Sequence, residues 1–223
     1  METLEKRKLH QSMLSRGPRN DGRIYFGVTT TGIYCRYPDL MEAFQHVRVP
    51  VAFDSFEVAT SVILSQFVST ERSGENFKKL IFCYSEAVAE LILEQLTHSF
   101  PSASLLHEVD FAGLGITQAH AAAIRELARL VDEGEIDLPQ MSDLESMRAK
   151  LLAIKGIGPW TVEVIALRCL CDATAFPAKD LIVARALEKF GFAADFFGPW
   201  RAYLALAICK IQGQLLTKKG KTT

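Results

Sequence analysis

The residues best placed to do chemistry are a glycine-rich turn and a single acid that follows it. The turn lies in 151–160, Leu-Leu-Ala-Ile-Lys-Gly-Ile-Gly-Pro-Trp, and the acid ends 176–180, Phe-Pro-Ala-Lys-Asp. Because Gly156 and Gly158 carry no side chain, backbone N–H groups of the turn can approach a phosphate oxygen. A carboxylate such as that of Asp180 can stabilise positive charge that develops during a reaction. The turn also fits an ordinary tight junction between two helices, and the pattern alone leaves both interpretations open.

Two helices must hold this turn, and a third must present the acid. A reciprocal capping box at 142–145 predicts a helix from there up to the turn. Pro159 suits the first position of the second helix, because its missing N–H would have no partner there. That helix is predicted to run to about Cys171. Lys179 or Asp180 then opens the third helix.

The rest of the chain predicts a mainly α fold. A helix is expected from Asp54 or Ser55 onward, with an apolar stripe of Phe56, Ala59, Ile63 and Phe67. Helical spacing predicts further helices near 2–15, 77–84, 88–96, 105–109, 118–133, 181–190 and from 199 onward. Aromatic and β-branched residues at 23–35 predict one or two short strands. We therefore expect roughly nine or ten helices and a small irregular or β-like N-terminal region.

Length and composition allow a large buried core. The chain has 223 residues, of which 49% are hydrophobic, and a net charge of -1. This charge argues against a protein that coats nucleic acid by bulk electrostatics. No apolar signal core follows the charged N-terminus, and Glu163, Arg168 and Asp172 interrupt the later apolar stretches. We expect no membrane partner and a cytoplasmic location.

The five cysteines are scattered along the chain. Only Cys169 and Cys171 are close together, and we expect them on one helix, where such neighbours point in different directions. This spacing favours neither a disulfide nor a metal pair, so we predict buried structural thiols and no metal site.

Several motifs resemble one family in the same order along the chain. The segment 152–168 followed by 172–180 is similar to the helix-hairpin-helix and Gly/Pro-Asp signature of base-excision DNA glycosylases. The branch that it resembles most is the bacterial DNA-3-methyladenine glycosylase II type. Three shorter stretches support the resemblance, namely Ile-Leu-Ser-Gln-Phe-Val-Ser at 63–69, Leu-Gly-Ile-Thr at 114–117 and Gly-Pro-Trp-Arg-Ala-Tyr at 198–203. The resemblance covers about 50–212.

The resemblance implies two helical lobes with a cleft between them, lined by the hairpin and by a catalytic Asp180. It implies pocket roles for Trp160 and Trp200, although both could be core aromatics. Phe67 falls at the family's intercalating wedge, but it could equally complete the stripe of its own helix. The residues that the resemblance assigns to DNA binding are Gly156, Ile157, Gly158, Thr161 and Phe67. We assign 1–45 to an N-terminal extension packed on the core, 46–216 to the glycosylase and 217–223 to a disordered tail.

The implied activity is hydrolysis of the N-glycosidic bond of alkylated bases in duplex DNA, as in base-excision repair. Strand-cleaving members have a lysine nucleophile where this chain has Trp160, while Lys155 lies in the turn, so no lyase activity is expected. No cofactor is expected either, because the four closely spaced cysteines of iron-sulfur members are missing. Family precedent would allow a monovalent cation at the carbonyl groups of 153–158. The expected state is a nucleoid-associated monomer on damaged double-stranded DNA.

Two other functions stay open at this point. A non-catalytic DNA-damage binding module could have kept the hairpin, and a glycosylase could act on oxidised or mismatched bases instead. The stretch 21–36 also resembles the start of the zinc module of adaptive-response regulators. It lacks that module's further cysteines after Cys35, so four-thiolate zinc binding is not expected there. A structural remnant and a reactive Cys35 are the two interpretations.

Overall fold

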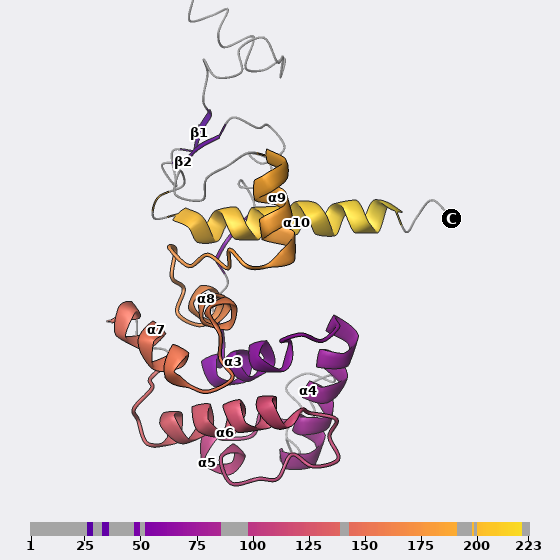
Figure 1. Cartoon of the computed structure of the whole chain (residues 1–223), viewed down its shortest axis with the longest axis vertical. Coiled ribbons are helices and arrows are strands. Elements are labelled where there is room, and N and C mark those ends of the chain that lie inside the picture. Colours follow the sequence, from indigo (N-terminus) through magenta and orange to yellow (C-terminus); the bar gives the residue numbers. More distant parts are fainter. Residues whose placement is uncertain are drawn as a thin grey trace, which may run out of the picture. The chain divides into compact units, whose positions relative to one another are not determined.

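The computed structural model describes residues 26–28, 33–35, 47–49, 52–85, 98–138, 143–190, 198 and 200–219. The chain divides into two compact units, one formed by Met1–Val49 with Ala178–Thr223 and the other by Pro50–Pro177. The described residues form eight helices and one two-stranded sheet (Figure 1). The predicted mainly α fold is thus confirmed. The domain boundaries at 45 and 216 stay predictions.

The Pro50–Pro177 unit holds six of these helices. They are α3 (Ser55–Leu64), α4 (Thr70–Tyr84), α5 (Ala103–Leu106), α6 (Gln118–Asp132), α7 (Leu144–Ala153) and α8 (Pro159–Arg168). Helix α3 lies between α6 and α8 and packs against both (Figure 1). Helix α7 packs on α8, α5 on α6 and α4 on α3. The helices of the predicted hairpin therefore rest on the core of this unit through α8.

The core explains why α3 is central. Its residues Ala59, Ile63 and Leu64 are fully buried, as are Ile124 on α6 and Ile165 on α8. Burying each large aliphatic side chain contributes about 1.5–3 kcal/mol. The predicted apolar stripe is confirmed for Phe56, Ala59 and Ile63, which are all buried.

Side-chain caps begin several of these helices. The Asp54 carboxylate accepts the N–H groups of Phe56 and Glu57, and Thr117 caps α6 through the His120 N–H. Helix α7 starts one residue later than the capping box at 142–145 predicted. Its N-cap is Asp143, whose carboxylate accepts the Ser146 N–H at 3.0 Å. Aspartate is as good an N-cap as serine, so both patterns fit the same sequence.

The second unit contains a hairpin and two helices. Strands β1 (Phe26–Val28) and β2 (Ile33–Cys35) pair antiparallel, with Phe26 opposite Cys35. The strand prediction for 23–35 is thus confirmed, while the zinc-module resemblance stays untested. Helices α9 (Leu181–Phe190) and α10 (Arg201–Lys219) pack against each other. Helix α10 includes 217–219, which the sequence assigned to the tail.

Two predictions about the cysteines are wrong. Helix α8 ends at Arg168, so Cys171 lies beyond it and has a positive φ of 51°. Cys169 is buried as predicted, but Cys83 and Cys209 are exposed. The Cys169 thiol donates to the Ser55 carbonyl at 3.4 Å, and burial raises its pKa to about 12.

Some predicted features lie outside the described residues. They are the helices near 2–15 and 88–96 and the first residue of the capping box, Ser142. Within the part of the chain that the structure describes, no helix is long and apolar enough to cross a membrane.

Candidate functional site

The glycine turn packs tightly on helix α6. After α7 ends, the Ile157 N–H donates to the Ile154 carbonyl at 3.0 Å, which closes the turn. Gly156 has a φ of 98°, and a Cβ there would lie 3.4 Å from both the Ala119 carbonyl and the Ala123 Cβ. Residues with a side chain rarely adopt this backbone conformation. Gly156 is therefore required by the turn itself.

Gly158 has a different task, because it is the N-cap of α8 and offers no side chain to cap it. Pro159 follows at the first helical position, as predicted. Within the described residues, the Gly158 N–H makes no hydrogen bond, and no atom lies within 4 Å of an added Cβ. The positive end of a helix dipole lies at this point. An anion can therefore approach the backbone here.

Two of the residues predicted to bind DNA have buried side chains, and their role stays a prediction. Ile157 is 5% exposed and Thr161 is 1% exposed. The Ile157 N–H is also used inside the turn. The burial of these residues suits support of the hairpin better than direct contact with DNA.

The predicted acid begins helix α9. The Asp180 Oδ1 accepts the N–H of Ile182 at 2.9 Å and of Val183 at 3.3 Å, and its carbonyl accepts the Ala184 N–H. A negative charge interacts favourably with such N–H groups at a helix N-terminus. Next to the acid, Leu181 remains 70% exposed. The backbone of α9 thus fixes where the carboxylate points.

Helix α10 approaches the same acid. Burial, together with the negative charge of Asp180, raises the pKa of the Cys209 thiol, although part of this residue remains exposed. Near the start of α10, the Trp200 ring meets the Tyr203 ring edge-on, with centroids 5.7 Å apart. This contact holds the Trp200 indole, which stays half-buried. Trp160, on the other unit, is also half-buried.

Phe67 has an unusual conformation in the loop after α3. It is fully exposed, at 101%, and its φ is 58°. Such left-handed backbone is disfavoured for a bulky residue and persists where the surroundings impose it. The preceding Gln66 is buried, which holds the loop in place. The alternative that Phe67 completes the apolar stripe of α3 is therefore wrong.

Comparison with known proteins finds relatives named as a DNA repair enzyme and as a DNA glycosylase. A probable bifunctional transcriptional activator/DNA repair enzyme AlkA from Mycobacterium tuberculosis is 35% identical over 165 residues, which are 70% of this chain and 33% of that protein. A DNA-3-methyladenine glycosylase from Bacillus subtilis is 35% identical over 172 residues, 71% of this chain and 47% of that protein. The chain thus spans less than half the length of either relative. No protein-family model matches it.

A solved structure shares the fold. An 8-oxoguanine glycosylase/lyase from Clostridium acetobutylicum, in complex with double-stranded DNA, superimposes with a TM-score of 0.63 at 17% identity, covering 80% of this chain and 68% of that one. In sequence and in fold, the chain is similar to helix-hairpin-helix DNA glycosylases. Relatives from Escherichia coli and Bacillus subtilis are named DNA-3-methyladenine glycosylases.

One ion-pair cluster in the structure was missed from the sequence. Arg148 on α7 joins Glu163 on α8 to Asp172, in the segment after α8. The sequence marked both acids only as charged interruptions of apolar stretches. Acids within such stretches are a signal for paired charges, because lone buried charges are too costly.

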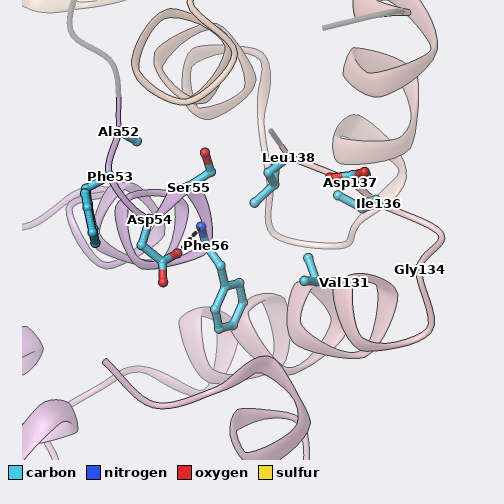
Figure 2. Close-up of a pocket in the computed structure, with 10 residues that line it drawn as sticks. All are labelled: Ala52, Phe53, Asp54, Ser55, Phe56, Val131, Gly134, Ile136, Asp137 and Leu138. Carbon is cyan, nitrogen blue, oxygen red and sulfur yellow. Dashed lines mark hydrogen bonds between the residues drawn. The ribbon is translucent and has the colours of Figure 1, made fainter. Parts of the chain in front are cut away.

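A pocket in the Pro50–Pro177 unit is lined by residues other than these. It has a volume of about 450 Å³ and is lined by 52–56, at the start of α3, and by the end of α6 with the segment after it. Figure 2 shows the Asp54 carboxylate bonded to the Phe56 N–H at its edge. None of the residues predicted to act on DNA lines this pocket.

The predicted absence of a cofactor remains a prediction, as does the monovalent cation. In the described part of the chain, no group of three His, Cys, Asp or Glu side chains could hold a metal ion. At the turn, the carbonyls of Ile154 and Gly158 accept the N–H groups of Ile157 and Val162. Each carbonyl oxygen has a second lone pair, so these bonds are compatible with a cation at the turn.

Proposed function

We propose that this chain is a monofunctional DNA glycosylase that removes alkylated bases of the 3-methyladenine type from duplex DNA. It would work as a monomer on damaged chromosomal DNA in the cytoplasm. The observation that supports the proposal most is the Asp180 carboxylate, which two backbone N–H groups orient at the start of α9. Its position in the sequence after the glycine turn is the one that the family's catalytic aspartate occupies.

The turn supplies a grip that is independent of base sequence. The Gly158 N–H and the positive end of α8 both favour a phosphate oxygen. Such a contact positions a protein on the DNA backbone and carries no sequence information. It therefore suits an enzyme that must act wherever damage occurs.

Asp180 supplies the chemistry. Breaking an N-glycosidic bond leaves positive charge on the sugar, and a nearby carboxylate stabilises that charge more in the transition state than in the ground state. The same carboxylate can orient the attacking water. An alkylated purine such as 3-methyladenine is already cationic, so it leaves readily and is attracted to indole faces such as those of Trp160 and Trp200. No strong general acid is then needed.

Phe67 supplies the wedge in this proposal. Taking a base out of the stack costs a few kcal/mol, and a side chain that fills the gap lowers this cost. A fully exposed ring in a constrained loop is suited to this task. The exposed area that is unfavourable in the free protein becomes buried between bases.

We also propose that the chain lacks lyase activity. A lyase needs an amine nucleophile at the reacting sugar, and Trp160 stands at the position where strand-cleaving members have lysine. Lys155 is exposed in the turn, outside that position. Base release should therefore leave an intact abasic strand, and borohydride should trap no covalent complex.

The decisive experiment measures base release from duplexes that carry alkylated, uracil or oxidised bases. We expect release from the alkylated duplex, with its loss in Asp180→Asn and retention of DNA binding. Binding without release from any duplex would instead support the non-catalytic module. Release only from the oxidised or uracil duplex would keep the enzyme class and refute the proposed substrate.

A further inference from the structure

We propose that Arg148, Glu163 and Asp172 form a positioning network, hereafter the Arg148 network, which sets the segment leading to Asp180. Its role rests on the proposed function, because it acts through the proposed catalytic acid. None of the three residues touches substrate in this proposal. They determine where the chain leaves the Pro50–Pro177 unit.

One guanidinium joins three elements. The Arg148 Nε donates to the Glu163 Oε1 at 2.9 Å, and its Nη2 contacts the Asp172 Oδ2. Arg148 lies on α7 and Glu163 on α8, so this contact ties the two helices of the hairpin together. The contact with Asp172 adds the segment that follows α8.

Both carboxylates also hold that segment by its backbone. The second oxygen of Glu163, Oε2, accepts the Phe176 N–H at 2.7 Å. The Asp172 Oδ1 accepts the Thr174 N–H at 2.8 Å and the Thr174 hydroxyl at 2.7 Å. The backbone of 172–176 is therefore fixed at alternate residues by side chains that Arg148 orients.

The charges of Arg148 and Asp172 persist at neutral pH. Burial opposes ionisation of Asp172, but hydrogen bonds from Thr174 and Arg148 outweigh it and hold the pKa of this carboxyl below its usual value. Burial likewise opposes the charge of Arg148, while Glu163 and Asp172 raise the pKa of its guanidinium. The ion pair between Arg148 and Asp172 is therefore kept at neutral pH.

Stability alone is a poor reason for such a network. Asp172 is 3% exposed, and removing a carboxylate from water costs as much as its ion pair returns, so apolar residues would often serve as well. Hydrogen bonds are directional and specify the orientation of a backbone, whereas apolar contacts do not. The network therefore specifies a conformation.

Only a short stretch of chain separates this segment from Asp180. Phe176 and Pro177 are buried, and Pro177 is the last residue of its unit. Asp180 follows three residues later, which is at most about 11 Å of extended chain. A displacement of the backbone at 172–177 would therefore also displace the Asp180 carboxylate. A misplacement of about 1 Å in an active site can cost on the order of 100-fold in rate.

A matched control lies on α6. Arg129 also bridges two carboxylates, with contacts to Glu126 and Glu133, but all three residues belong to the surface of one helix and its C-cap. Arg129→Met therefore removes the same chemical group without touching 172–177. Arg148→Lys is the conservative variant, because lysine keeps the charge but cannot hold two carboxylates in a fixed fork.

The test uses the full chain, with single-turnover base release and DNA affinity measured separately. We expect Arg148→Met to slow release by about 100-fold and to change the DNA dissociation constant by less than about threefold. Arg148→Lys should recover part of the rate, and Arg129→Met should match the wild type. If Arg148→Met does not fold, Thr174→Val replaces it, with a smaller loss of rate expected. The proposal is overturned if a folded Arg148→Met releases base at the wild-type rate. If Arg148→Met does not fold, a wild-type rate of release in Thr174→Val overturns it. The proposal is also overturned if the rate of base release and the affinity for DNA fall together in the variant.

Hydrogen exchange separates this proposal from the proposed function. The amides of Thr174 and Phe176 should exchange faster in Arg148→Met, while those of α3 stay protected as in the wild type. A wild-type chain that releases no base refutes the proposed function and the catalytic role of the network together. Unchanged exchange in 172–177 refutes the network alone, even if the enzyme is active.

Discussion

Replacing Phe67 with glycine should make the protein more stable and less active at the same time. The side chain is 101% exposed, so its removal loses no packing. A residue with a Cβ costs about 1–2 kcal/mol in left-handed backbone such as its φ of 58°. Glycine avoids this cost but loses about 0.5–1 kcal/mol more backbone entropy on folding. The net gain is about 0.5–1 kcal/mol, or roughly 1–4 °C in Tm for a chain of this length.

The activity should move in the opposite direction. Stacking of an aromatic side chain on a base contributes about 1–3 kcal/mol, so Phe67→Gly should slow base release from a paired duplex roughly 10- to 100-fold. The loss should shrink when the same lesion lies unpaired, because less unstacking is then needed. Single-turnover release from the two duplexes measures this difference.

Two variants serve as controls for Phe67→Gly. Phe67→Ala also removes the ring but keeps a Cβ at the strained φ, so its activity should fall while its Tm stays near that of the wild type. Phe53 is just as exposed, at 109%, and its φ is not positive. Phe53→Ala should therefore leave both properties unchanged. A lower Tm for Phe67→Gly would refute the strain, and equal losses of release in Phe53→Ala would refute the wedge.

Further predictions separate the roles of individual residues. Gly156→Ala should lower the unfolding free energy by about 1–3 kcal/mol in chemical denaturation, because it is strained at a φ of 98°. Gly158→Ala should fold normally but bind DNA more weakly in a titration, because its methyl group blocks the N–H. The pKa of Cys169 lies at about 12 against an ordinary 9.0, so the stability from its neutral thiol should be present below pH 9.0 and decline towards pH 12. Cys169→Ala should remove this alkaline decline in pH-dependent denaturation. Asp172 has a lowered pKa, so the stability from its carboxylate should be present above pH 3.8 and vanish as the pH falls through its folded pKa. In Asp172→Asn, the unfolding free energy should therefore depend less on pH in this acidic range.

Local patterns in the sequence were enough to predict most helices. The apolar spacing after Asp54, Thr117 as a cap and Pro159 at the first helical position are all found in the structure. Each depends on residues within one or two turns of each other, which is the range over which a sequence specifies helix formation. The predicted end of α8 was wrong because the residues after Arg168 are apolar enough to continue a helix. The positive φ of Cys171 lies in the irregular segment after that helix.

The sequence by itself determined the hairpin, the acid that follows it and the family that these motifs resemble. Only the tertiary structure decided that Phe67 leaves the core, that Thr161 enters it, and that Gly156 adopts a positive φ where it contacts α6. It alone revealed how Arg148 meets Glu163 and Asp172. The physical reason is that burial and hydrogen-bond partners depend on how distant elements pack, whereas caps, turns and periodicity act between neighbours in the chain.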